Sequence, residues 1–327
     1  MHILVAGGAG YVGSHAVEAL LELGAKPTIV DDFSTGHQWA LQGANVIEVD
    51  ITDLPALRKA LSGLRPDGVM HFAAKSIVSE SMIDPTKYFF NNVTGSINLI
   101  RWCLENAVPN FVFSSTAAVY GNPVSDVIDE SHTLSPINPY GQSKFFVEQI
   151  LNRVHSANGL SSISFRYFNA AGASKSSQIG EDHEPETHLI PNVLKSILKS
   201  DSNSKLKIYG NDYPTNDGTC VRDYVHVSDL AEAHVSALSF LTSNAGSFKI
   251  NLGTGRGYSV MEILEACQKV TGKTISFEVA DRREGDPAVL VASNQLAKDL
   301  LDWQPKESIL EIIRDAYRWH SLRSNFD

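Results

Sequence analysis

Residues 2–24 read HILVAGGAGYVGSHAVEALLELG, and this stretch decides the fold. An apolar run of strand length, His2–Ala6, is followed by a glycine-rich turn, Gly7–Gly13, and by a helical pattern, Ser14–Leu23. Strand, glycine-rich turn and helix in this order predict a dinucleotide-binding unit, because the turn and the helix N-terminus together suit a pyrophosphate. A plain glycine-rich turn is the alternative, which the flanking elements disfavour. The spaced glycines are Gly7, Gly10 and Gly13.

The next apolar run, Pro27–Val30, ends at the acidic pair Asp31-Asp32, roughly 20 residues past the glycines. A carboxylate at this place accepts hydrogen bonds from adenosine ribose hydroxyls and repels a 2′-phosphate. No Arg lies near the turn to neutralise such a phosphate. The pattern therefore favours NAD over NADP, with a solvated strand end as the alternative for Asp31.

Tyr140 and Lys144 stand four residues apart in the motif NPYGQSK. Asn138 can cap a helix and Pro139 suits its first turn, so the Tyr and Lys side chains would share one helical face. A nearby cation, or the positive ring of an oxidised nicotinamide, favours the phenolate form of a Tyr. The pair predicts a Tyr that takes a proton from a sugar or alcohol hydroxyl and returns it. A chance pair on an exposed helix is the alternative.

Apolar runs and helical patterns alternate as far as about residue 170, which predicts an α/β fold with a doubly wound, Rossmann-like parallel sheet. A long helix is expected at Tyr88–Glu105. Ligands of such sheets lie over the carboxyl ends of the strands, where Ala73, Ala74, Thr116 and Asn169 fall. The further strands are expected at 45–50, 68–74, 110–115 and 162–167.

The amino-acid composition changes after Asn169, where the chain becomes rich in Gly, Ser, Glu and His and shows little periodicity. We therefore expect an NAD-binding domain at 1–175 and a smaller C-terminal α/β substrate-binding domain at 176–327. The segment 222–242 is expected to pack back partly on the first domain. Later elements are expected at 192–199, 207–210, 227–241, 260–271 and 308–320.

The composition is that of a soluble globular protein, with 43% hydrophobic and 20% charged residues and a net charge of −10. This charge argues against a nucleic-acid partner. The three Cys lack C-x-x-C spacing and indicate free thiols in a reducing cytosol rather than a disulfide frame or zinc site, and no metal is expected. The sequence opens directly into a strand, so no signal peptide is expected, and no apolar stretch is long enough to span a bilayer. The expected location is the cytoplasm.

With these features in place, the chain resembles the extended short-chain dehydrogenase/reductase family, and within it the UDP-glucose (UDP-galactose) 4-epimerases. The resemblance spans nearly the whole chain, and the run from Gly210 to Ala231 is its most specific part. The glycine turn and the Tyr/Lys pair mark only the wider family. The matching motifs are GGAGYVGSH (7–15), VDDFSTG (30–36), HFAA (71–74), FSSTAAVYG (113–121), PYGQSK (139–144), RYFNAAGA (166–173), GNDYPTNDGTCVRDYVHVSDLA (210–231), NLGTGRGYSV (251–260) and RREGDPA (282–288).

The resemblance implies reversible epimerisation of UDP-glucose and UDP-galactose at C4 through a 4-keto sugar, with NAD held tightly, in an expected homodimer. The implied catalytic residues are Tyr140, Lys144 and Thr116. The implied cofactor-binding residues are Gly7, Gly10, Tyr11, Val12, Gly13, Asp31, Asp32, Phe33, Ser34, Thr35, Gly36, Asp50, Ile51, Phe72, Ala73, Ala74, Asn91, Ser114, Tyr140, Lys144 and Phe168. The implied substrate-binding residues are Ser76, Thr116, Tyr140, Asn169, His188, Leu189, Tyr209, Arg222, Arg283, Asp286 and Leu290.

Some positions depart from the family pattern or stay open. Ser76 falls where some epimerases carry a Lys, and Lys75 is one place off and does not inherit that role. Leu290 stands at a position where the size of the side chain varies among family members. The sequence therefore does not decide whether N-acetylated, pentose or uronic UDP-sugars are also substrates. Surface salt bridges are the alternative for Arg222 and Arg283, and simple exposure is the alternative for His188.

Other functions were weighed on the same motifs. A nucleotide-sugar dehydratase commonly carries Thr-Asp-Glu in its active site, whereas this chain has Thr116-Ala117-Ala118. A non-catalytic NAD-binding protein would usually have lost the Tyr or the Lys, and both are present. The physiological direction, and whether UDP-galactose serves galactose metabolism or polysaccharide supply, do not follow from the sequence.

Overall fold

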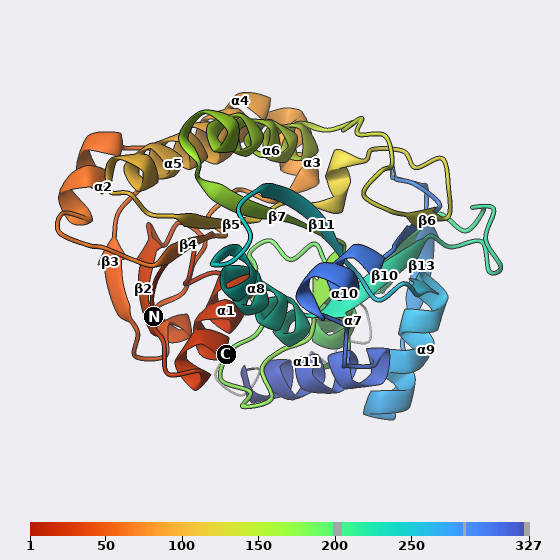
Figure 1. The fold of residues 1–327 in the computed structure, drawn as a ribbon. Coiled ribbons are helices and arrows are strands. Elements are labelled where there is room, and N and C mark those ends of the chain that lie inside the picture. Colours follow the sequence, from red (N-terminus) through yellow and green to blue (C-terminus); the bar gives the residue numbers. More distant parts are fainter. Residues whose placement is uncertain (199–204, 284–285, 324–327) are drawn as a thin grey trace.

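The computed structural model describes residues 1–198, 205–283 and 286–323. Its centre is a seven-stranded, all-parallel sheet with the strand order β11-β7-β5-β4-β1-β2-β3 (Figure 1). The predicted doubly wound α/β fold is thereby confirmed. The strands are β1 His2–Ala6, β2 Lys26–Asp31, β3 Asn45–Glu48, β4 Gly68–His71, β5 Asn110–Ser114, β7 Ser161–Tyr167 and β11 Ser247–Leu252.

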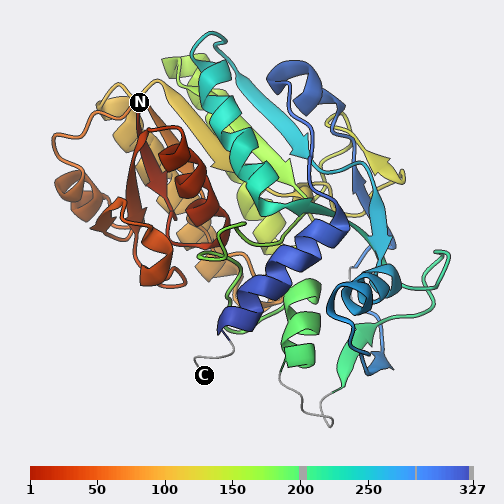
Figure 2. The same ribbon diagram turned by 90° about the horizontal axis from the view of Figure 1, so that it is seen from below.

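Helices cover both faces of this sheet, because its strands are apolar on both sides. On one face α1 (Tyr11–Glu22) packs beside α8 (Val227–Leu241), and on the other lie α2 (Leu54–Ala60), α5 (Gly95–Glu105) and α6 (Pro139–Asn158) (Figures 1 and 2). Each face has its own cluster of buried apolar side chains. Because all seven strands are parallel, their carboxyl ends lie along the same edge of the sheet, where ligands of such folds bind.

The helix expected at Tyr88–Glu105 is interrupted by a wider turn. α3 (Val78–Ile83) and α4 (Pro85–Tyr88) precede a π-helical segment, η2 (Phe89–Thr94), which leads into α5. Such π segments are often found at functional positions. Short 3₁₀ helices are η1, Gln38–Leu41, and η3, Ala117–Val119.

A second group of elements lies beside the carboxyl edge of the large sheet. α7 (Leu189–Leu198), α9 (Val260–Thr271) and α11 (Ile309–Arg323) pack around a third apolar cluster (Figure 2). α10 (Gln295–Leu301) instead packs on α8 and β11. The smaller strands are β6 Val127–Ile128, β8 Asn169–Ala171, β9 Leu206–Tyr209, β10 Val221–His226, β12 Gly257–Ser259, β13 Phe277–Ala280 and β14 Val289–Ala292.

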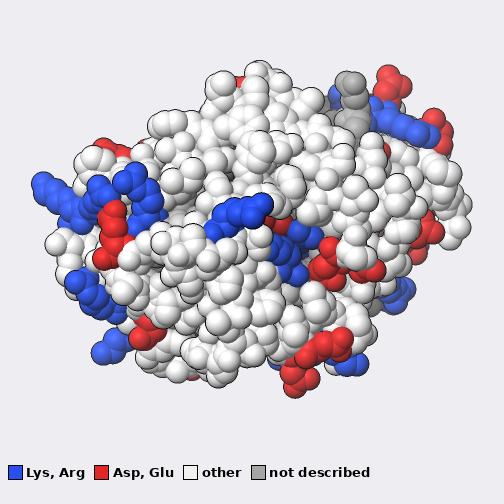
Figure 3. Space-filling model, turned by 45° about the horizontal axis from the view of Figure 1, so that its top comes forward, with Lys and Arg blue, Asp and Glu red and all other residues white. Residues whose placement is uncertain are grey.

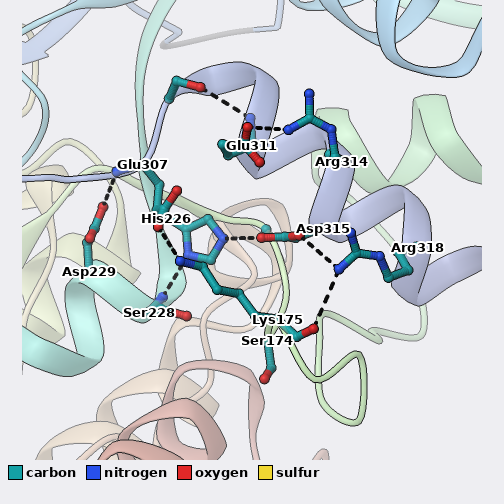
Figure 4. A network of polar contacts seen from close by, with 12 residues as sticks. Ser174, Lys175, His226, Ser228, Asp229, Glu307, Glu311, Arg314, Asp315 and Arg318 are labelled. Carbon is teal, nitrogen blue, oxygen red and sulfur yellow. Dashed lines mark hydrogen bonds and ion pairs between the residues drawn. The ribbon is translucent and has the colours of Figure 1, made fainter.

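A polar network ties α11 to the start of α8 and to the chain after β8 (Figure 4). Asp315 lies 3.4 Å from the buried His226 ring and 3.5 Å from Arg318. Asp229 accepts hydrogen bonds from the backbone N–H groups of Lys306 and Glu307 at 3.1 and 3.2 Å. The last helix is thus fixed to both groups of elements.

The sequence expectations differ from this fold in a few places. The strands at 45–50 and 68–74 end earlier, at Glu48 and His71, and the helix expected at 192–199 begins at Leu189, with residue 199 outside the described residues. β11 and β10 were not expected at all. β11 pairs with β7 and belongs to the large sheet although it follows residue 176. The division at 175/176 stays a prediction.

Candidate active site at the carboxyl ends of the strands

The glycine-rich turn leaves no room for side chains. A Cβ on Gly7 would lie 2.4 Å from the backbone nitrogen of Ala73, and one on Gly13 would lie 2.1 Å from the carbonyl oxygen of Gly7. Gly7 also has a φ of +80°, which side chains rarely allow. The turn after β1 therefore lies directly against the end of β4, and Gly10 is the N-cap of α1, where no side chain accepts from the first N–H groups of the helix.

Asp31 lies at the end of β2 with its carboxylate turned toward this turn. It accepts hydrogen bonds from the backbone N–H groups of Ala9 at 3.0 Å and Phe33 at 2.9 Å. Burial raises the pKa of Asp31, and the two N–H groups oppose that rise. A carboxylate oxygen has further lone pairs, so Asp31 can still accept from a ribose hydroxyl. Asp32 accepts from the N–H of Ser34 at 2.9 Å.

The chain after β4 joins the Asp31 loop to the π-helical segment. The side chain of Lys75 donates to the Ser34 hydroxyl at 2.9 Å, and its backbone N–H donates to the side-chain oxygens of Asn91 at 3.1 Å and Asn92 at 2.8 Å. Asn92 also donates to Ser143 of α6 at 2.9 Å. Through Asn91 and Asn92, η2 thus connects the segment after β4 to helix α6, and the sequence analysis assigned both regions to binding of the cofactor.

The predicted Tyr/Lys pair lies on α6 as expected. Asn138 caps the helix by accepting from the N–H of Gly141 at 2.8 Å, and Pro139 is its first residue. Lys144 is buried, and its ammonium group donates to the Ser114 carbonyl at 2.8 Å. Burial alone lowers the pKa of Lys144 to about 7. Thr116, two residues after β5, caps η3 by accepting from the N–H of Ala118 at 3.1 Å.

Tyr140 lies in a mostly apolar setting. Burial raises its pKa, while a hydrogen bond with the Thr116 hydroxyl lowers it. Its ring meets the ring of Tyr88 edge-on at 6.5 Å. A positive charge bound beside the phenol would favour its phenolate form.

A buried polar network that the sequence analysis missed supports this helix. Glu148, one turn beyond Lys144, pairs with Arg166 of β7 through contacts of 3.0 and 2.6 Å. Ser115 donates to Glu148 at 2.5 Å, and Arg166 donates to the Tyr120 hydroxyl at 3.0 Å. The spacing Tyr140-Lys144-Glu148 on one helical face was the available signal.

The predicted UDP-sugar residues meet in pairs on the second group of elements. Arg222 of β10 forms an ion pair with Asp286. The guanidinium of Arg283 lies 4.1 Å from the ring centre of Tyr209. Leu290 of β14 pairs in register with Arg222. Two guanidinium groups near apolar and aromatic surface can hold a diphosphate and a base.

Two neighbouring residues link the end of β7 in the large sheet to this group: Phe168 directly follows β7, and Asn169 begins β8 of the smaller sheet. Asn169, in β8, donates to the carbonyl of Asp223 at 3.0 Å, and β8 pairs with β10. Phe168 packs with Leu290 against one small apolar cluster that includes Tyr120. The predicted cofactor and substrate residues therefore approach each other here.

The remaining predicted residues are more scattered. The Tyr11 hydroxyl donates to the carbonyl of Gly172 at 2.8 Å, and Phe72 lies 4.7 Å from the His234 ring. Asp50 accepts from the Thr52 N–H at 2.7 Å. The others lie as follows: Val12 in the first turn of α1, Thr35 and Gly36 in the loop after β2, Ile51 buried after β3, Ala74 half-buried after β4, Ser76 exposed, and His188 and Leu189 at the start of α7.

Comparison with known proteins adds to this geometry. Residues 3–253 match the model of the NAD dependent epimerase/dehydratase family. The UDP-glucose 4-epimerase of Halalkalibacterium halodurans is 46% identical over 321 residues, which cover 98% of this chain and 96% of the relative.

Solved structures agree with the sequence match. The UDP-glucose 4-epimerase from Brucella ovis in complex with NAD is 41% identical, with a TM-score of 0.94 over 98% of both chains. The UDP-glucose 4-epimerase from Bifidobacterium longum in complex with NAD⁺ and UDP is 34% identical, with a TM-score of 0.94 over 99% of both chains.

Proposed function

This chain belongs to the NAD dependent epimerase/dehydratase family, and from that premise we propose that it interconverts UDP-glucose and UDP-galactose by epimerisation at C4. The observation that carries the proposal is the near full-length match to proteins named UDP-glucose 4-epimerase. Tyr140, Lys144 and Thr116 supply the proton chemistry that such a reaction requires.

The residues of the nucleotide site fit NAD. Side chains at Gly7 and Gly13 would collide with backbone, so the turn keeps its N–H groups close to where a pyrophosphate would sit. Asp31 is placed to accept from the adenosine ribose and to disfavour a 2′-phosphate. NAD supplies reversible hydride acceptance, and Lys144 would hold its nicotinamide ribose.

Tyr140 acts as the general base and then as the general acid. It takes the proton of the sugar 4-hydroxyl, directly or through Thr116, and gives it back after the 4-keto sugar has presented its other face. Burial raises its pKa, and the positive ring of bound NAD⁺ would favour the phenolate.

Arg222, Arg283, Asp286 and Tyr209 would hold the UDP group while the sugar turns. An Arg forms paired hydrogen bonds with phosphate oxygens, and Asp286 can accept from the uridine ribose. The ion pair between Arg222 and Asp286 supports this proposal, because it brings the two side chains together beside β10 and the segment before β14.

The same proposal includes a homodimer. Exposed apolar side chains gather on α3, η2, α5 and α6, where the surface seen in Figure 3 has broad areas without charged residues. Sedimentation equilibrium should show a dimer that Phe90→Glu weakens and that Leu23→Glu, on the far side of the sheet, leaves intact. These side chains are Val78, Met82, Ile83, Phe90, Ile97 and Phe146.

Within the described residues, the longest helices are too short or too polar to cross a membrane. A cytoplasmic location is part of the proposal.

The test is to incubate the purified protein with UDP-galactose without added NAD and to identify the nucleotide sugar that forms. UDP-glucose should appear, at a rate at least ~100-fold lower in Tyr140→Phe. Parallel incubations with UDP-N-acetylgalactosamine and UDP-xylose decide the sugar range. Conversion of one of these, with none of UDP-galactose, would reject the proposed substrate.

A further inference from the structure

Two His and two Glu come together in the loop between β8 and α7. They follow the spacing E-x-H-x-x-E-x-H and are Glu181, His183, Glu186 and His188. One nitrogen or oxygen from each side chain lies within 4.8 Å of the others. Glu181 Oε1 is 2.7 Å from His188 Nδ1 and 3.3 Å from His183 Nδ1, and Glu186 Oε1 is 3.0 Å from His188 Nδ1. The sequence analysis expected no metal, and it assigned only His188 a role.

The two carboxylates are buried, and the groups nearest to them that can carry positive charge are His188, which contacts both, His183 and the more distant Lys195. The Glu181 and Glu186 side chains are 4% and 6% exposed. Among the described residues, neither Glu186 Oε2 nor His183 Nδ1 makes a hydrogen bond. The Lys195 ammonium is 3.6 Å from Glu186 Oε2, beyond hydrogen-bonding distance. Buried carboxylates in this state are costly unless a cation pairs with them.

We propose that these four side chains bind one Zn²⁺ ion. Two carboxylates and two neutral imidazoles balance the charge of a divalent cation. Ligand atoms of a tetrahedral zinc site with bonds of about 2.0–2.1 Å are about 3.3 Å apart, and three of the pairs here are 2.7, 3.0 and 3.3 Å apart, with all pairs within 4.8 Å. Two imidazole ligands favour Zn²⁺ over Mg²⁺ and Ca²⁺, which prefer oxygen ligands only.

The surroundings of the cluster indicate a structural role for the ion. Four protein ligands leave no open position for a reacting group. Trp319 of α11 donates to the Glu181 carbonyl at 3.1 Å, and His37 lies 2.9 Å from the Asp182 carbonyl. The Tyr11 ring meets the His183 ring edge-on at 6.2 Å. The ion would therefore fix the loop where α1, α11 and α7 meet. His188 is also an implied substrate-binding residue, so the site is tested by metal binding and not by epimerase activity.

Metal binding to the full-length protein tests the site. Protein stripped with a chelator and dialysed should take up one equivalent of Zn²⁺ in competition with a chromophoric chelator. Co²⁺ in place of Zn²⁺ should give the strong visible absorption of a four-coordinate site. Amide exchange of residues 181–188 should slow when Zn²⁺ is added.

Matched variants locate the ion. Glu186→Gln and His183→Asn should lower Zn²⁺ affinity roughly 100-fold or more, since even changes behind the ligands cost 10- to 100-fold. Glu184→Gln, an exposed carboxylate of the same loop, should leave affinity unchanged. If Glu186→Gln does not fold, the Zn²⁺ affinity of His183→Asn is compared with that of Glu184→Gln instead. Binding below one-tenth equivalent, or equal affinity in Glu184→Gln and a folded ligand variant, would overturn the proposal. Unchanged amide exchange in the loop would overturn the structural role.

Discussion

The buried pair Glu148–Arg166 should stabilise the fold far more than a surface pair of the same chemistry. The Glu148 and Arg166 side chains are 0% and 3% exposed, and two contacts of 3.0 and 2.6 Å join them. Glu148→Gln keeps the shape but leaves the guanidinium of Arg166 without a counter-charge. Removing one partner of a buried pair costs about 3–5 kcal/mol. The Ser115 hydroxyl, which donates to Glu148, also loses a charged acceptor.

The chain offers a control of equal chemistry on its surface. Arg58 and Glu105 form a similar two-contact pair whose side chains are 43% and 41% exposed. Glu105→Gln should leave the free energy of unfolding nearly unchanged, because solvent screens exposed pairs. The double variant Glu148→Leu/Arg166→Met should recover much of the loss, because it leaves neither charge buried alone.

Urea unfolding at pH 7, with NAD in fixed excess, measures these differences from midpoints at a constant slope. The expected order of stability is the parent protein and Glu105→Gln together, then the double variant, then Glu148→Gln. A Glu148→Gln protein within about 1 kcal/mol of the parent would refute the reasoning, as would a double variant no more stable than the single one.

Three further outcomes are expected. Tyr140→Phe should lower turnover at least ~100-fold with little change in UDP affinity, whereas Thr116→Ser should stay active and Thr116→Ala should be affected less than Tyr140→Phe; near-normal turnover without the phenol would exclude it as the base. Arg222→Ala should weaken UDP binding roughly 10- to 150-fold, as loss of a charge-assisted hydrogen bond implies, while Arg256→Ala should not, and equal titrations of both would exclude Arg222 as the anchor. Leu290→Ser should raise kcat/KM for N-acetylated substrates relative to UDP-galactose by about ten- to two-hundredfold; an unchanged ratio would show that another residue limits the pocket.

Sequence motifs of a few residues were enough to predict the main elements in the first half of the chain. The glycine turn predicted the β1–α1 unit because its backbone contacts, with Gly7 against Ala73, permit no side chain. Asn138 and Pro139 predicted the start of α6 because a cap and a first-turn Pro act within a few residues. The general rule that strand ends carry the ligand site placed Thr116 after β5, but it did not indicate that Lys144 donates to the carbonyl of Ser114 at the end of β5.

Long-range pairing was harder to predict. β11 lies next to β7, 85 residues away in the sequence at the pair Ser162 and Ser247. Its alternating Phe248, Ile250 and Leu252 were a usable strand signal, but nothing local indicates which sheet a short strand joins. The Glu148–Arg166 pair was missed for the same reason, because charged residues are usually exposed unless a distant partner is known.

The unexpected strand β11 explains how the catalytic helix and the substrate side are held together. Asn251 of β11 accepts from the Tyr120 hydroxyl at 2.6 Å and donates to the carbonyl of Ile128, in β6, at 3.0 Å. Tyr120 in turn contacts Arg166, which pairs with Glu148 of α6. β6 pairs with β14, the strand of Leu290. A continuous buried network therefore runs from the Tyr140 helix to the strand beside Arg222. Because buried networks hold one geometry when every member is satisfied, this connection would keep the proposed general base and the proposed UDP anchor in a fixed relation during the proposed reaction.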